Sequence, residues 1–80
     1  MYSTSGVPDL ICCINGYSVF IEVKAQNGTP SDLQLEHIKQ IRKAGGFAYV
    51  AYPSGWEKLK DIIDGLLIDK FNREEDVILK

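Results

Sequence analysis

Three residues near the start of the chain, Asp9, Glu22 and Lys24, combine the side-chain types that metal-assisted phosphodiester hydrolysis requires. Mg²⁺ takes oxygen ligands, commonly one or two carboxylates, with the remaining positions left to water and substrate phosphate. A nearby lysine can position or deprotonate the attacking water, or stabilise the negative charge that develops on the phosphate. This chemistry is available only if the fold brings the three side chains together.

A β-hairpin over residues 9–24 would bring them together. Residues 9–14 form a short apolar run, and residues 17–24 alternate and are rich in β-branched and aromatic side chains. Asn15-Gly16 between the runs is the strongest short-range hairpin signal, because a type I′ turn needs positive φ at both central residues. With this turn, Asp9 faces Glu22 across the two strands.

The predicted register places the Cβ atoms of Asp9 and Glu22 about 5 Å apart. Lys24 follows Glu22 by two positions, so strand alternation puts both side chains on one face. Directly opposed like charges destabilise a strand pair, and a divalent cation between them would compensate the repulsion. The alternatives are that Asp9, which follows Pro8, is a turn residue, and that Glu22 and Lys24 form an ordinary surface ion pair.

The rest of the chain predicts the elements that hold this hairpin. A strand, a helix and a second strand in succession favour parallel pairing, so we expect a small mixed α/β sheet: the N-terminal hairpin plus a crossover strand, flanked by helices. The chain should form one domain over residues 1–80, with a core of about 5–68. The expected elements after the hairpin are a helix from Thr29 or Ser31 to about Ala44, a buried strand over 47–52, an amphipathic helix over 56–68 and a tail, 69–80, without a clear pattern.

Composition limits the class of protein. The chain has 80 residues and a mass of 9.0 kDa, which is the size of one domain. It has no apolar run of the roughly 20 residues that a membrane span needs, and its first residues lack the pattern of a secretory signal, so a cytoplasmic location is expected. One histidine and two adjacent cysteines do not make a zinc site. The net charge of -2 gives no support for nucleic-acid binding, although it leaves room for a local basic surface.

Several short motifs occur in a specific order. They are Gly6-Val7-Pro8-Asp9, then Ile21-Glu22-Val23-Lys24, then Ser31 with Gln34, then Gly45-Gly46. Over about residues 5–60 this order resembles the PD-(D/E)xK nuclease superfamily, and more narrowly its VRR-NUC (virus-type replication-repair nuclease) branch. The resemblance implies a restriction-endonuclease-like core in which Asp9, Glu22 and the main-chain carbonyl of Val23 bind Mg²⁺ or Mn²⁺. It also implies that Lys24 handles the attacking water and that Gln34 supports the catalytic site.

The resemblance further implies a metal-dependent, structure-specific DNA endonuclease, with branched double-stranded DNA, above all the Holliday junction, as substrate. It implies a homodimer that needs neither a membrane nor a nucleotide cofactor. Short nucleases of this kind are typical of bacteriophage genomes, so the expected location is the cytoplasm of a bacterial host. Family members usually carry an N-terminal helix with a glutamate before the first motif, whereas eight residues precede Asp9 here. The alternatives are therefore a catalytically silent DNA-binding or assembly module of the same fold, or a plain protein-interaction domain.

Other polar residues on the first helix are weaker candidates. Ser31, Lys39, Arg42 and Lys43 are candidate sequence-independent contacts to the DNA backbone, with a solvated helix face as the alternative. His37 is a candidate phosphate contact, although a boundary position between core and solvent is the more common role of such a histidine. Trp56 belongs either to the core or to a subunit interface.

Overall fold

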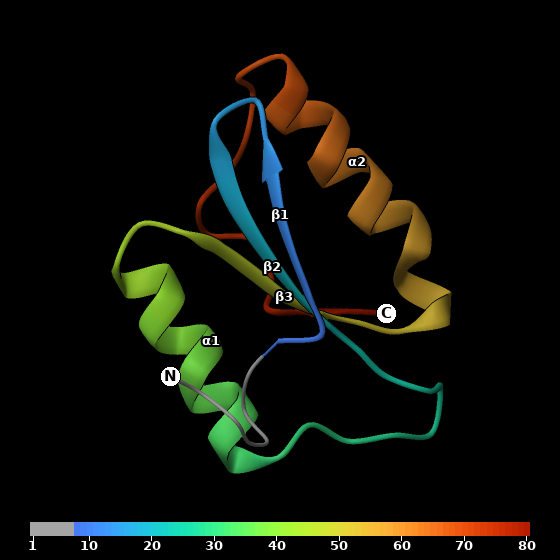
Figure 1. The fold of residues 1–80 in the computed structure, drawn as a ribbon. Coiled ribbons are helices and arrows are strands. Elements are labelled where there is room, and N and C mark those ends of the chain that lie inside the picture. Colours follow the sequence, from blue (N-terminus) through green and yellow to red (C-terminus); the bar gives the residue numbers. More distant parts are fainter. Residues whose placement is uncertain (1–7) are drawn as a thin grey trace.

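A computed structural model describes residues 8–80 of the chain. Its central feature is a four-stranded sheet with the strand order β1-β2-β3-β4. Figure 1 shows this sheet between two helices, with α1 on one side and α2 on the other. In chain order the elements are β1 (Leu10–Ile14), β2 (Tyr17–Val23), α1 (Asp32–Lys43), β3 (Phe47–Ala51), the 3-10 turn η1 (Pro53–Gly55), α2 (Trp56–Leu67) and β4 (Ile78–Leu79).

The predicted hairpin is present, with the predicted register. Asn15 and Gly16 have φ values of 52° and 83°, as a type I′ turn requires. Across the antiparallel strands Ile14 pairs with Tyr17, and Ile11 pairs with Phe20. The turn is also anchored, because the Asn15 side-chain amide donates to the main-chain oxygen of Leu66, at 3.0 Å, near the end of α2.

Helix α1 begins and ends where its sequence signals are strongest. Ser31 is the N-cap, and together with Gln34 it forms a capping box. The C-cap is Ala44, and Gly45 follows with a φ of 98°, a left-handed conformation that glycine adopts without strain. The predicted helix over these residues is therefore confirmed.

Strand β3 lies in the middle of the molecule and is buried along its whole length. It pairs in parallel with β2, so that Glu22 stands beside Val50, and the sheet is mixed as expected. The side chains of the sheet form one core under each helix. The core under α2 contains Val19, Ile21, Phe47, Tyr49, Ala51, Leu59, Ile62, Leu66 and Leu79, and the core under α1 contains Ile38, Ala48, Val50 and Tyr52.

The C-terminal tail, which has no clear pattern of its own, adds the fourth strand. Ile78 and Leu79 pair in parallel with Val50 and Ala51. Arg42 of α1 holds the approach to this strand, because its guanidinium donates to the main-chain oxygens of Glu75 and Asp76 at 2.7 and 3.2 Å. Within residues 8–80 no helix combines the length and the apolar character needed to cross a membrane.

Candidate active site

The candidate site lies where β2 ends and β1 begins. Asp9 immediately precedes β1, and its Oδ2 accepts a hydrogen bond of 2.9 Å from the main-chain nitrogen of Val23. That nitrogen belongs to the peptide that joins Val23 to Glu22, so the Asp9 carboxylate lies beside the Glu22–Val23 peptide. The Pro8-Asp9 half of the first motif thus meets the end of β2, while Gly6 and Val7 lie outside the described residues.

Glu22 is the chemically unusual residue of the sheet, because it is a carboxylate that is only 4% exposed. Its Oε2 accepts a hydrogen bond of 2.6 Å from Nε2 of Gln34 and lies 3.4 Å from Nζ of Lys24. Its Oε1 is buried and has no hydrogen-bond partner within the described part of the chain. Leaving a buried acceptor unpaired costs about 1–3 kcal/mol, and more for a charged group. The unpaired oxygen of Glu22 is therefore available as a metal ligand. Keeping it buried and unpaired lowers the stability of the fold, and a residue with a purely structural role would not require that loss.

Hydrogen bonds at the start of α1 fix the orientation of the Gln34 side chain. Its Oε1 accepts a 2.8 Å hydrogen bond from the main-chain nitrogen of Ser31, while its own main-chain nitrogen donates to Ser31 Oγ at 3.1 Å. With the amide oxygen used in this capping box, the amide nitrogen is the end that reaches Glu22. Ser31 was predicted as a DNA contact, and the structure gives it the N-cap role. The Ser-x-x-Gln spacing of a capping box was the sequence signal for this arrangement.

The segment between β2 and α1 is tied to the end of β3. The hydroxyl of Tyr52 donates to the main-chain oxygen of Gly28 at 2.7 Å. The side-chain amide of Gln26 both donates to Ser54 Oγ and accepts from the Ser54 main-chain nitrogen, at 2.9 and 3.0 Å. These contacts fix the path by which the chain leaves Lys24. Sequence reasoning missed them, because they join residues more than twenty positions apart.

The donor set suits a hard divalent cation. The Asp9 carboxylate, the unpaired oxygen of Glu22 and the main-chain carbonyl of Val23 are oxygen atoms, which Mg²⁺ and Mn²⁺ prefer. Within residues 8–80 no group of three or more histidine, cysteine, aspartate or glutamate side chains is placed to hold a metal. Two carboxylates, one just before β1 and one near the end of β2, leave most coordination positions to water and phosphate, as is usual for Mg²⁺.

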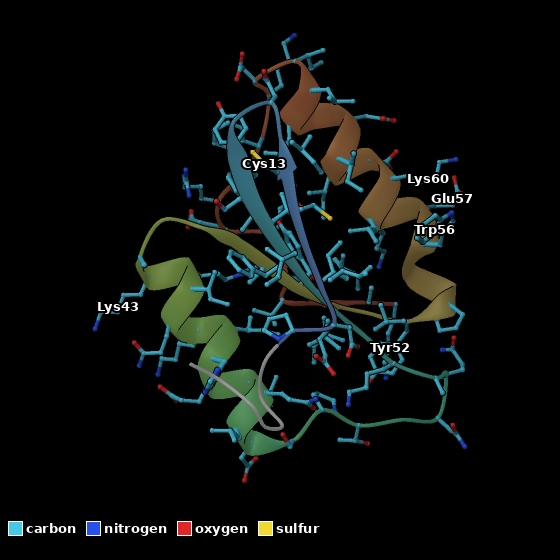
Figure 2. All side chains as sticks on the ribbon, viewed as in Figure 1. Cys13, Lys43, Tyr52, Trp56, Glu57 and Lys60 are labelled. Carbon is cyan, nitrogen blue, oxygen red and sulfur yellow. The ribbon has the colours of Figure 1, made fainter. Side chains whose placement is uncertain are left out.

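The residues of α1 that were predicted to contact DNA differ in their exposure to solvent. Lys39 and Lys43 are exposed, and Figure 2 shows Lys43 projecting from the last turn of α1 away from the sheet. Arg42 instead is half-buried against the fold: it donates to the main-chain oxygens of three residues, and its guanidinium carbon lies 4.9 Å from the centre of the Tyr49 ring. We therefore do not include Arg42 among the proposed phosphate contacts. His37 is half-buried on the same helix.

The mixed sheet, the two flanking helices and the buried glutamate at a strand end define a small α/β domain with a nuclease-like core. The family model described as the VRR-NUC domain matches residues 2–54. This span is more than half of the chain, so the chain belongs to the VRR-NUC domain family, and the predicted resemblance is confirmed. The match contains every residue of the candidate site and ends before α2. No curated protein and no solved structure matches the chain significantly.

Membership of this family indicates a nuclease-type function on DNA.

Proposed function

We propose that this protein is a Mg²⁺-dependent, structure-specific endonuclease that cuts branched DNA, with the four-way Holliday junction as its main substrate. The observation that carries the proposal is the buried carboxylate of Glu22. One of its oxygens is held by Gln34 and Lys24, and the other has no hydrogen-bond partner among residues 8–80. Asp9 lies at the adjoining peptide, so a cation could be shared by two carboxylates.

Each residue has a distinct part in the proposed reaction. Asp9, Glu22 and the carbonyl of Val23 would hold Mg²⁺ or Mn²⁺, which when bound lowers the pKa of water and neutralises charge on a phosphate. Lys24, whose side chain is about one-fifth exposed, has its ammonium group beside Glu22 and open to solvent on one side. It would orient the attacking water and stabilise charge that develops on the phosphate. Gln34 would keep Glu22 in place without adding a charge.

Recognition is proposed to depend on DNA shape and backbone. Lys39 and Lys43 on the exposed side of α1 would contact phosphates, which positions a protein on DNA but carries no sequence information. Two copies of the chain would present two sites to the two symmetric strands of a junction. The surface that favours a homodimer is β1, an edge strand on which Ile11 is 64% exposed. A mass of one protomer in light scattering at micromolar concentration would contradict the dimer.

The function is tested by cleavage of a labelled four-way junction, a flap and a linear duplex. Wild-type protein and Lys24→Ala are each assayed with Mg²⁺, Mn²⁺ or EDTA. We expect symmetric nicking of the junction by the wild type with either metal, and at least a 100-fold lower rate for Lys24→Ala, because general acid–base groups contribute about 10²–10⁴-fold. A matched control is Lys60→Ala, which removes an exposed lysine that lies on α2.

The second candidate is a catalytically silent DNA-binding or assembly module of the same fold. It is favoured by the small donor set, since the described residues bring only two carboxylates to the site. This candidate predicts metal-independent binding of the junction with no product on any substrate. Cleavage that requires both metal and Lys24 would exclude it.

A further inference from the structure

A small apolar hollow lies beside the candidate active site, at the start of α2. Its volume is about 120 Å³, which suits a flat ring system and is too small for a helix or a strand. Trp56 forms part of its wall and is 58% exposed, although it is a large apolar side chain. The remaining wall residues are Leu10, Ile21, Val23, Lys24, Ala51, Tyr52, Pro53 and Leu59.

The hollow and the site proposed for the phosphodiester meet at the end of β2, where the hollow lies on the α2 side of the sheet and Glu22 on the α1 side. Lys24 belongs to both, since its Nζ lies 3.4 Å from Glu22 and the residue also lines the hollow. Val23, whose carbonyl is a proposed metal ligand, is likewise a wall residue. DNA whose phosphate lies at the carboxylates would therefore reach this apolar surface by passing the end of β2 at Lys24.

The charge around the hollow also favours DNA. None of its lining residues is acidic, and a second ammonium group, on Lys80, lies 4.5 Å from the centre of the Tyr52 ring in the wall. A larger hollow, near Glu74 and Asp76, has four carboxylates in its lining and would repel a phosphate chain. Figure 2 places Trp56 on the first turn of α2, at the edge of the molecule.

We propose that this hollow receives an unstacked nucleobase of DNA whose backbone passes the end of β2 at Lys24, and that the base stacks on Trp56. The proposal rests on the proposed nuclease function and adds a base-binding subsite to it. Aromatic side chains bind unpaired bases of any sequence by stacking, because every base has a π-face. A subsite of this kind favours branched or frayed DNA over a linear duplex, since the base at a branch point is already partly unstacked.

Trp56 is the single tryptophan of the chain, so its fluorescence reports directly on this hollow. Wild-type protein in EDTA, where no cleavage occurs, is titrated with a thymidine oligonucleotide of about ten residues, a length within the usual range of single-strand sites. The comparison probe is an abasic oligonucleotide of the same length and charge. We expect saturable quenching by the first probe, and about 5- to 100-fold weaker binding of the second, in line with the usual gain from base–aromatic stacking.

Variants separate stacking from folding. Trp56→Ala should bind a labelled thymidine oligonucleotide about 5- to 100-fold more weakly, whereas Trp56→Phe should retain most of the affinity because a ring remains. Leu67→Ala is the matched control, since Leu67 is also exposed, at 56%, but lies at the other end of α2. Its affinity should equal that of the wild type. Circular dichroism melts show whether each variant is folded.

The outcomes distinguish this subsite from the nuclease function. Three results would overturn the subsite: equal quenching by the two probes, unchanged binding by Trp56→Ala, or an emission change that depends only on protein concentration. The third result would assign the hollow to a second copy of the chain. Base-dependent quenching by a protein that cuts no substrate would leave the subsite standing and overturn the nuclease function. Metal-dependent cleavage without base-dependent quenching would support the nuclease function and overturn the subsite.

Discussion

A single substitution, Gln34→Glu, would turn the attractive contact between residue 34 and Glu22 into a repulsive one. The change keeps the capping box of α1, because a glutamate at this position accepts from the main-chain nitrogen of Ser31 as a glutamine does. It replaces the nitrogen that donates to Glu22 at 2.6 Å by a carboxylate oxygen. The helix start is thus preserved while two carboxylates are forced together.

The expected loss in the free energy of unfolding is about 3 kcal/mol at neutral pH. A hydrogen bond to a charged group contributes about 1.5–3 kcal/mol, and removing one partner of a buried charged pair costs about 3–5 kcal/mol. Lys24, 3.4 Å from the same oxygen of Glu22, offsets part of the added repulsion. In a domain of this size such a loss lowers the melting temperature by about 12–24 °C.

The assay is urea unfolding of the wild type and Gln34→Glu between about pH 4 and pH 8, a range that spans carboxylate titration. The difference between them should shrink toward the acid end, because one proton shared by the two carboxylates removes the repulsion. The matched control is Gln40→Glu on the same helix, where Gln40 Nε2 donates to the exposed Glu36 at 2.8 Å. There the same chemical change should cost no more than about 0.5 kcal/mol.

A loss in Gln34→Glu as small as that in Gln40→Glu would refute the reasoning. It would mean that the Glu22 side chain is free to turn away from Gln34, so that α1 does not fix the candidate metal ligand. A loss of the same size at all pH values would also contradict it, because it would come from packing and not from charge.

Three further predictions concern the metal, the tail and pH. At a Mg²⁺ concentration about ten times its Kd, the ion should add about 1.4 kcal/mol to the unfolding free energy of the wild type, measured by calorimetry, and add nothing to Glu22→Gln. Arg42→Met should lower the free energy of unfolding by about 2–4 kcal/mol and speed hydrogen exchange at the Val50 amide, which bonds to the tail. An unchanged exchange rate would show that Arg42 does not hold the tail. Burial raises the pKa of the Glu75 carboxyl, so its contribution to stability is present at low pH and is lost as the pH rises through the folded value. Glu75→Gln should therefore raise the melting temperature at pH 7 and leave it unchanged well below the pKa of the unfolded carboxyl, and an equal rise at both pH values would contradict this.

Local signals were sufficient for most elements of the fold. Asn15-Gly16 fixed a two-residue turn and with it the hairpin register, because the side-chain period of a strand allows no slip without exposing the core. The apolar spacing in residues 56–67 predicted α2 to within a residue of its end. The family followed from the order of short motifs, and that order is also a property of the chain alone.

The candidate site was predictable in part. Asp9, Glu22 and Lys24 could be placed at one strand end from register and alternation, but the sequence carried no sign that Glu22 would be buried with one oxygen unpaired. That depends on β3, which packs beside β2, and on Gln34, which reaches the carboxylate from α1. The roles of residues on α1 were equally dependent on packing.

By itself, therefore, the sequence determined the hairpin, the helices, the family and the residues that could do chemistry, because each depends on neighbours in the chain. Only the tertiary structure decided two other features. Arg42 bonds to carbonyls more than thirty positions away, and β4 forms from two residues that have no strand pattern of their own. Such contacts are selected by the whole packed fold, because a two-residue strand or a half-buried guanidinium is stable only when its distant partners are already in place.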